Sequence, residues 1–253
     1  MPKYFVKPEE IDKETGAILI GGENADHLVT AMRARRGDSV IVCDGNCIDY
    51  SCEITDIVTG RDKRLTLKIL SKSAVREPRL KVTLYQAIPK ADKMEYVIQK
   101  CVEMGIYEII PIYTDNSDIK VLSEAKLARY RKISGASAKQ SMRGIIPYFG
   151  APVTLDQAVA DSGRTGFTFA PYENEHSTGL KDVLSKTNMA EISSAAFFIG
   201  SEGGFSETEA GLFVKAGIPR VSLGPRILRT ETAGFAVLTI LMYVSNELSV
   251  YAR

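Results

Sequence analysis

The chain has 253 residues, enough for one or two domains, and its composition is that of an ordinary globular protein, with 45% hydrophobic and 25% charged residues. These values exclude a collagen-like, disordered or coiled-coil chain. The formal net charge is +1, so the total charge does not argue for a nucleic acid or a membrane as partner, and any basic surface has to be local.

Features that direct a chain to an oxidising compartment or a membrane are weak in this sequence. The first ten residues hold no apolar stretch of signal-peptide length. The longest apolar run, residues 235–244, is shorter than the roughly 18 residues that a membrane span needs. Four cysteines are too few for a disulfide-dense scaffold, so we expect buried, unpaired cysteines and a cytoplasmic protein.

The first 72 residues have the pattern of a small β domain. Strands are predicted over residues 39–43, 47–54 and 65–70, and Asp44-Gly45 between the first two is a strong hairpin signal. Residues 26–35 are the one helical candidate. The polar segment 71–78 ends in proline and is the best boundary, so we expect one domain over 1–72 and a second over 73–253.

The second part alternates between strand and helix patterns. Strands are expected over residues 81–88, 107–113, 167–170, 195–200 and 220–224. Helices are expected over 92–104 and 123–142, from the capping box at Ser206 onward, and over 232–248. Asp92 is a candidate N-cap residue for the first of these helices. This alternation predicts a mainly parallel α/β sheet.

Two glycine-bearing loops follow the last two predicted strands. They are Ile199-Gly-Ser-Glu-Gly-Gly-Phe-Ser206 and Leu223-Gly-Pro-Arg-Ile-Leu-Arg-Thr-Glu-Thr-Ala233. The carboxyl ends of parallel strands are where α/β proteins place ligands. Neither loop matches the dinucleotide or P-loop fingerprints. No serine hydrolase elbow is present, His176 is interpreted as an ordinary loop residue, and no metal site is expected from the cysteines and histidines.

The two loops together closely resemble the C-terminal signature of the ribosomal RNA small subunit methyltransferase E family, SPOUT-class enzymes that methylate N3 of a uridine. Three further segments are similar to the same family: Lys93-Met-Glu-Tyr-x-x-Gln-Lys-x-x-Glu-Met-Gly105, Ala138-Lys-Gln-Ser-Met-Arg143 and His27-Leu-x-x-x-Met-Arg33. One departure is Ser201, where the family usually has proline, and we expect it to loosen the loop slightly.

The resemblance implies a fold and a set of partners. It implies a PUA-like β-barrel domain that precedes an α/β domain with helices on both faces of the sheet and a C-terminal trefoil knot. The cofactor would be S-adenosylmethionine, bound in the knot of a homodimer. The substrate would be small-subunit (16S) ribosomal RNA or the assembled small subunit, with neither membrane nor metal involved.

The resemblance and the chemistry of the reaction suggest three groups of site residues. Arg229 or Arg226 would stabilise charge on the uracil oxygens, and Glu202 or Glu231 would accept the N3 proton. The cofactor would be held by Ala170, Gly200, Gly203, Leu223, Gly224, Ile227, Leu228, Thr230 and Ala233. RNA would contact Arg33, Arg35, Arg36, Lys139, Gln140, Arg143 and Arg226.

Alternatives remain open for several of these residues. Leu223, Ile227 and Leu228 are equally compatible with plain core packing, and the basic residues with a solvated charged face. For the whole protein, the alternatives are a ribose 2′-O methyltransferase and a non-catalytic RNA-binding assembly protein on the same scaffold.

Overall fold

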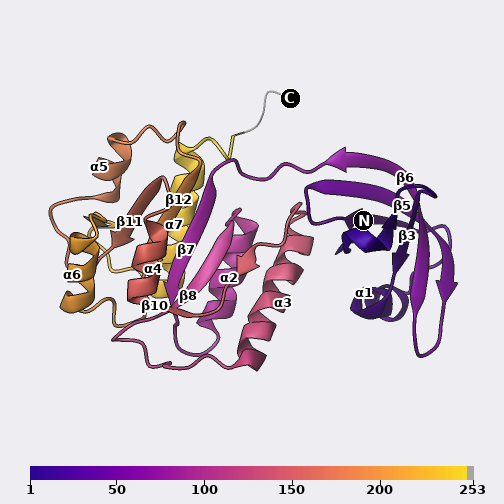
Figure 1. Cartoon of the computed structure of the whole chain (residues 1–253), viewed down its shortest axis with the longest axis horizontal. Helices are drawn as coiled ribbons and strands as arrows, with labels where there is room; N and C mark the ends of the chain where they lie inside the picture. The colour runs from indigo at the N-terminus through magenta and orange to yellow at the C-terminus, as the bar shows by residue number, and fades with distance from the viewer. Residues whose placement is uncertain (250–253) are drawn as a thin grey trace. The chain divides into compact units, whose positions relative to one another are not determined.

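The computed structural model describes residues 1–249 and divides the chain into two compact units (Figure 1). The first unit comprises Met1–Glu77 together with Ala138–Ile146, and the second comprises Pro78–Ser137 and the chain from Pro147 onward. The boundary expected after residue 72 falls inside strand β6 (Arg64–Ala74), shortly before this division. The sequence did not predict that Ala138–Ile146, which follows part of the second unit in the chain, belongs to the first unit.

The first unit is built on one six-stranded sheet. Its strands, in spatial order, are β1 (Lys3–Phe5), β4 (Ser39–Cys43), β5 (Ile48–Val58), β6 (Arg64–Ala74), β3 (Ala17–Ile20) and β2 (Ile11–Asp12). Only the pair of β1 and β4 is parallel. The predicted hairpin between β4 and β5 is confirmed: Gly45 has a φ of +75°, and Asp44 Oδ1 accepts hydrogen bonds from two amides beyond it.

Short helical turns complete this unit. They are η1 (Pro8–Glu10), α1 (Gly22–Asp26) and η2 (His27–Ala31). The helix expected over residues 26–35 therefore begins four residues earlier and ends at Ala31. Arg33, just beyond it, has a φ of +52°, a value that takes the chain out of the helical region.

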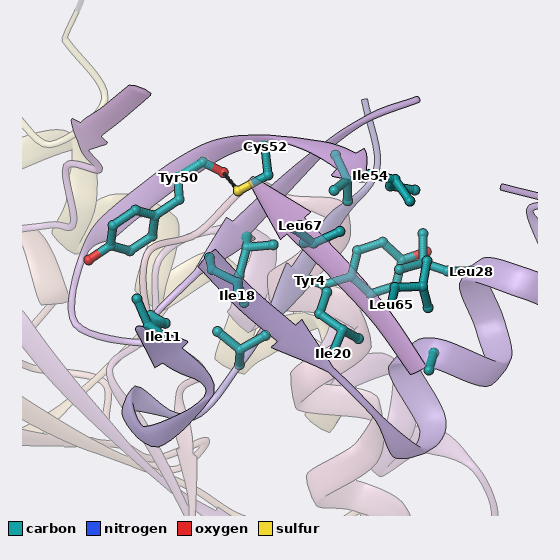
Figure 2. Packing of buried hydrophobic residues seen from close by; sticks show 14 residues of the cluster. Tyr4, Ile11, Ile18, Ile20, Leu28, Tyr50, Cys52, Ile54, Leu65 and Leu67 are labelled. Atoms are coloured by element: carbon teal, nitrogen blue, oxygen red, sulfur yellow. Dashed lines mark hydrogen bonds between the residues drawn. The ribbon is translucent and has the colours of Figure 1, made fainter. Parts of the chain in front are cut away.

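Alternating apolar side chains of the sheet form the core of the first unit (Figure 2). Ile18 and Ile20 of β3 are fully buried, as are Leu65 and Leu67 of the neighbouring β6. Period-2 alternation puts such pairs on the same face of a strand. Each contributes about 1.5–3 kcal/mol relative to an exposed side chain, so this cluster holds the small unit together.

The segment of residues 138–146, here called the strap, is fixed to the first unit by buried polar contacts. Arg143 is 6% exposed, and its guanidinium pairs with the carboxylate of Glu77, with Nε 3.0 Å from Oε2. The amide of Gly144 donates to the other Glu77 oxygen at 2.7 Å, and its carbonyl accepts from Cys47 N at 3.0 Å. The strap is therefore an integral part of this unit.

The second unit contains the parallel sheet that the alternation of strands and helices predicted. Its spatial order is β10 (Val153–Thr154), β8 (Glu108–Tyr113), β7 (Lys81–Ala87), β12 (Ser194–Ile199), β11 (Phe167–Pro171) and β13 (Arg220–Val221), with β9 (Tyr148–Phe149) also paired to β8. Every pair is parallel, which confirms the prediction.

Six helices accompany this sheet: α2 (Lys93–Glu103), α3 (Glu124–Gln140, whose last three residues belong to the strap), α4 (Leu155–Ser162), α5 (Leu180–Ser185), α6 (Glu207–Lys215) and α7 (Thr230–Val244). Tyr85 of β7 and Phe198 of β12 pack in one cluster with α4 and α6 residues. The alternate residues Leu84 and Gln86 face Gly234 of α7. Helices thus cover both faces, as expected.

Helix ends agree with the sequence in part. The capping box that begins α6 is confirmed, since Ser206 N and Glu209 N each donate to the other residue's side chain, at 2.9 and 3.2 Å. Asp92 precedes α2 as expected but makes no side-chain capping bond. Helix α7 begins at Thr230, two residues earlier than expected. None of the helices within residues 1–249 combines the length and hydropathy that a bilayer-spanning helix requires.

Candidate functional site

A cavity of about 850 Å³ lies at the carboxyl ends of three neighbouring strands in the second unit. Its walls come from the loops after β11, β12 and β13, here called the 172–178 loop, the 200–206 loop and the 222–229 loop, and from the first residues of α2 and α7. The volume is within the range of small-molecule sites, and the position is where open α/β sheets bind ligands.

Glycines bring the backbone of these loops close to the cavity. Gly204 has a φ of +64°, and a Cβ there would lie 2.8 Å from the Glu173 carboxylate. A Cβ on Gly200 would lie 2.9 Å from the backbone of Gly204, so the two ends of this loop approach this closely only with glycine at position 200. Gly224 has a φ of +104° with open space beside its Cα. These positions of the site therefore offer backbone groups to a ligand.

A chain of buried hydrogen bonds holds two of the loops together. Gln86 is fully buried, and its Nε2 donates to Thr230 Oγ1 at 2.9 Å, whose hydroxyl in turn donates to the Gly200 carbonyl at 2.6 Å. Both hydrogen-bonding functions of Thr230 are thus used inside the protein. Although Thr230 lines the cavity as expected, we conclude that its hydroxyl supports the 200–206 loop.

Acidic and basic side chains meet at one wall of the cavity. Glu202 Oε1 accepts from Lys93 Nζ at 2.7 Å and from the amide of Lys90 at 3.1 Å. Burial by itself raises the pKa of Glu202, but the hydrogen bonds from Lys93 and from backbone amides outweigh it and hold that pKa below its ordinary value. A carboxylate with a lowered pKa is a weak proton acceptor, which counts against Glu202 as the general base.

Two arginines line the cavity with exposed side chains. Arg226 and Arg229 both belong to the 222–229 loop, and within residues 1–249 neither guanidinium makes a hydrogen bond or an ion pair. Arg229 is also the N-cap residue of α7. Both guanidinium groups are therefore available to an anionic or carbonyl-bearing ligand.

Most of the residues proposed for the cofactor meet at the cavity, but not all of them. The cavity is lined by Gly200, Leu223, Gly224, Ile227, Leu228, Thr230 and Ala233, and by Arg229 and Glu202 among the proposed catalytic residues. Ile227 is 86% exposed, so core packing is excluded for it. Ala170 is buried in β11, Gly203 accepts a hydrogen bond from Asn116, and neither lines the cavity, nor does Glu231.

Sequence reasoning missed one wall of the site. Tyr172, Glu173, Asn174 and His176 of the 172–178 loop line the cavity, as does Lys93 at the start of α2. The interpretation of His176 as an ordinary loop residue was incomplete. The position of this loop in the sequence could have indicated its role. The loop is polar and follows the carboxyl end of β11, a correctly predicted strand that lies next to β12.

Ser201 is anchored rather than loose. It is 6% exposed, and its hydroxyl donates to the Asn116 carbonyl at 2.9 Å. The expectation that serine loosens the loop was therefore wrong, because the hydrogen bond restrains the chain at this position. No group of three potential metal ligands occurs within residues 1–249.

The candidate RNA residues in the first unit differ in their availability. Arg33, Arg35 and Arg36 are exposed, as is Gln140. Arg143 is buried against Glu77, so its guanidinium is committed to the strap, against the expectation of an RNA contact. Lys139 is half-buried, donates to Asn24 Oδ1 at 3.0 Å and lies over the ring of Tyr4, and burial lowers its pKa.

The chain combines a mainly β unit with a parallel-sheet unit whose loops line a cavity, and its sequence matches two RNA methyltransferase family models, one in each part. Residues 76–242 match the model of the RNA methyltransferase domain, and residues 20–69 match the RNA methyltransferase PUA domain. The chain is 30% identical to ribosomal RNA small subunit methyltransferase E of Bacillus subtilis, with 98% of each chain covered. It is 31% identical to the enzyme of the same name from Synechocystis, over 91% of this chain and 74% of the relative.

Among solved structures, a Legionella pneumophila protein described as in complex with the cofactor SAM is 28% identical, with a TM-score of 0.83 over 95% of this chain and 96% of that one. The chain belongs to the ribosomal RNA small subunit methyltransferase E family.

Proposed function

We propose that this protein transfers the methyl group of S-adenosylmethionine to N3 of a uridine in small-subunit ribosomal RNA. The observation that carries the proposal is the cavity at the carboxyl ends of β11, β12 and β13, where two exposed arginines lie on a glycine-bearing loop. Family membership supports the cofactor and the RNA class, and the chemistry of the arginines supports the acceptor.

The cavity residues fit S-adenosylmethionine. The open space beside Gly224, where a Cβ would otherwise stand, allows a ligand to approach the backbone closely. Ile199, Leu223 and Leu228 supply apolar walls for an adenine ring, and the exposed Glu173 carboxylate can accept hydrogen bonds from sugar hydroxyls. When bound, the cofactor supplies an electrophilic methyl group.

The chain's own residues then position the uracil and stabilise charge. N3 carries an imide-like proton, and its removal places negative charge on the neighbouring carbonyl oxygens. The guanidinium of Arg229, with Arg226 as the second candidate, donates to these oxygens as a fixed two-pronged donor. Glu202 and Glu231 are the two candidates for the proton acceptor: Glu202 lines the cavity but is held as a carboxylate by Lys93 and the Lys90 amide, and Glu231 does not line the cavity.

We propose further that RNA binds through Arg33, Arg35, Arg36 and Gln140, and that the trefoil knot and the homodimer of the SPOUT class are present. Exposed apolar side chains on α7, Ile240, Tyr243 and Val244, support the homodimer because an isolated surface helix rarely exposes such a cluster. The proposed substrate places the reaction in the cytoplasm.

The test is methyl transfer from labelled S-adenosylmethionine to small ribosomal subunits that lack the modification, followed by nucleoside digestion and mass analysis. We expect label in 3-methyluridine, and we expect Arg229→Ala to lose at least about 100-fold in kcat while it keeps the wild-type unfolding midpoint. Label in a 2′-O-methylated nucleoside would contradict the proposed acceptor. Cofactor binding without transfer would favour the non-catalytic assembly protein.

A further inference from the structure

Lys93 connects three segments of the cavity that are far apart in the sequence. It is the first residue of α2, and its Nζ lies 2.7 Å from Glu202 Oε1 and 4.0 Å from Glu231 Oε2. Glu202 belongs to the 200–206 loop, and Glu231 is the second residue of α7. A single ammonium group therefore lies between the loop after β12 and the helix that follows β13.

This arrangement differs from an ordinary surface ion pair. The side chains of Lys93, Glu202 and Glu231 are only 34%, 27% and 15% exposed. Glu231 Oε2 is shielded from solvent, and within residues 1–249 it has no hydrogen-bond partner. An exposed pair contributes little, but removing the cation beside a largely buried carboxylate is costly because the carboxylate loses its counter-charge.

We propose that Lys93 is a positioning residue of the methyltransferase site: by binding Glu202 and Glu231 together, it fixes the 200–206 loop against the start of α7 in the arrangement that binds the cofactor. The inference rests on the proposed function for the nature of the ligand. Lys93 acts through the two carboxylates and has no part in the chemical step.

Other charged groups near the cluster do not replace Lys93. The amide of Lys90 donates to Glu202, but the ammonium of Lys90 pairs with Asp118. Without Lys93, two carboxylates that shared one cation would remain within about 7 Å of each other and repel. Burial is the largest influence on the pKa of Glu202 and raises it. Without Lys93, only the hydrogen bonds from backbone amides would still lower that pKa.

The experiment measures the Kd of the full chain for S-adenosylmethionine by isothermal titration calorimetry, without RNA, at about pH 8 and about pH 6. For Lys93→Met we expect about tenfold weaker binding at the higher pH and a substantial recovery at the lower pH, because protonation of one carboxylate removes the repulsion. Wild-type affinity should change little over this range. Lys93→Arg should restore binding at both pH values.

Two further variants separate this role from a general loss of structure. Adding Glu202→Gln to Lys93→Met removes the repulsion and should recover affinity at about pH 8. Lys100→Met changes a lysine of the same helix whose ammonium, within residues 1–249, pairs only with Glu103, three residues on, and it should leave the Kd unchanged. If Lys93→Met fails to fold, Lys93→Gln provides the same comparison.

Wild-type affinity in the Lys93 variant at both pH values would overturn the inference. A loss that is equal at both pH values and is not relieved by Glu202→Gln would overturn it as well. The proposed function fails separately: wild-type protein that binds the cofactor but forms no 3-methyluridine refutes the proposed acceptor and leaves the role of Lys93 to be decided by these affinities.

Discussion

Removing the Thr230 hydroxyl is the most direct test of the buried hydrogen bonds that link α7 to the 200–206 loop. Thr230→Val keeps the shape of the side chain and removes both hydrogen bonds, the one donated to Gly200 O and the one accepted from Gln86 Nε2. Gln86 is fully buried and Thr230 is 5% exposed, so water cannot replace either partner. Each of the two buried groups left unsatisfied costs about 1–3 kcal/mol, which gives a predicted loss of about 2–6 kcal/mol.

Urea unfolding followed by circular dichroism measures this loss as a change in midpoint at constant slope. The matched control is Thr239→Val on the same helix, where the hydroxyl donates to Phe235 O one turn earlier, and there we expect a loss below about 1 kcal/mol. Thr230→Ser should retain most of the wild-type stability. If Thr230→Val costs no more than Thr239→Val, the reasoning about the buried hydrogen-bond chain is wrong.

Two further predictions concern the strap and the 200–206 loop. Glu77→Leu removes the carboxylate that pairs with the buried guanidinium of Arg143 and should cost about 3–5 kcal/mol in urea unfolding, whereas a loss below about 1 kcal/mol would show that the pair is dispensable. Gly204→Ala puts a Cβ against the Glu173 carboxylate at a positive φ and should weaken cofactor binding at least about tenfold. Gly211→Ala, whose Cβ meets nothing within 4 Å in α6, should bind as the wild type does, and equal affinities in the two variants would count against the steric argument.

The parallel sheet was predictable because its central strands are continuous apolar runs. Residues 195–199 are buried on both faces, and this produces an unmistakable hydrophobic segment. Strands of two residues, such as β9 and β10, carry no periodicity and were missed. Helix α4 was missed although its capping box, Thr154 with Gln157, can be found in the sequence.

The site was predictable where local chain geometry determines it, and not where distant segments meet. Glycine loops after strands indicated the cavity, and ten of the residues expected there line it. The burial of Arg143 was not predictable, because the pattern of a charged helix end does not reveal that Glu77 lies opposite. The same limit explains Lys93, whose partners are more than 100 residues away in the sequence.

The strap has a consequence for how the protein is made. The first unit is not a contiguous N-terminal domain, since its residues 138–146 follow a 60-residue stretch of the second unit. On the ribosome, Glu77 emerges well before Arg143. The ion pair between the two residues can form only after Arg143 has also been synthesised. The first unit can therefore complete its structure only after about a third of the second has emerged, and a gene fragment that ends near residue 77 encodes an incomplete fold.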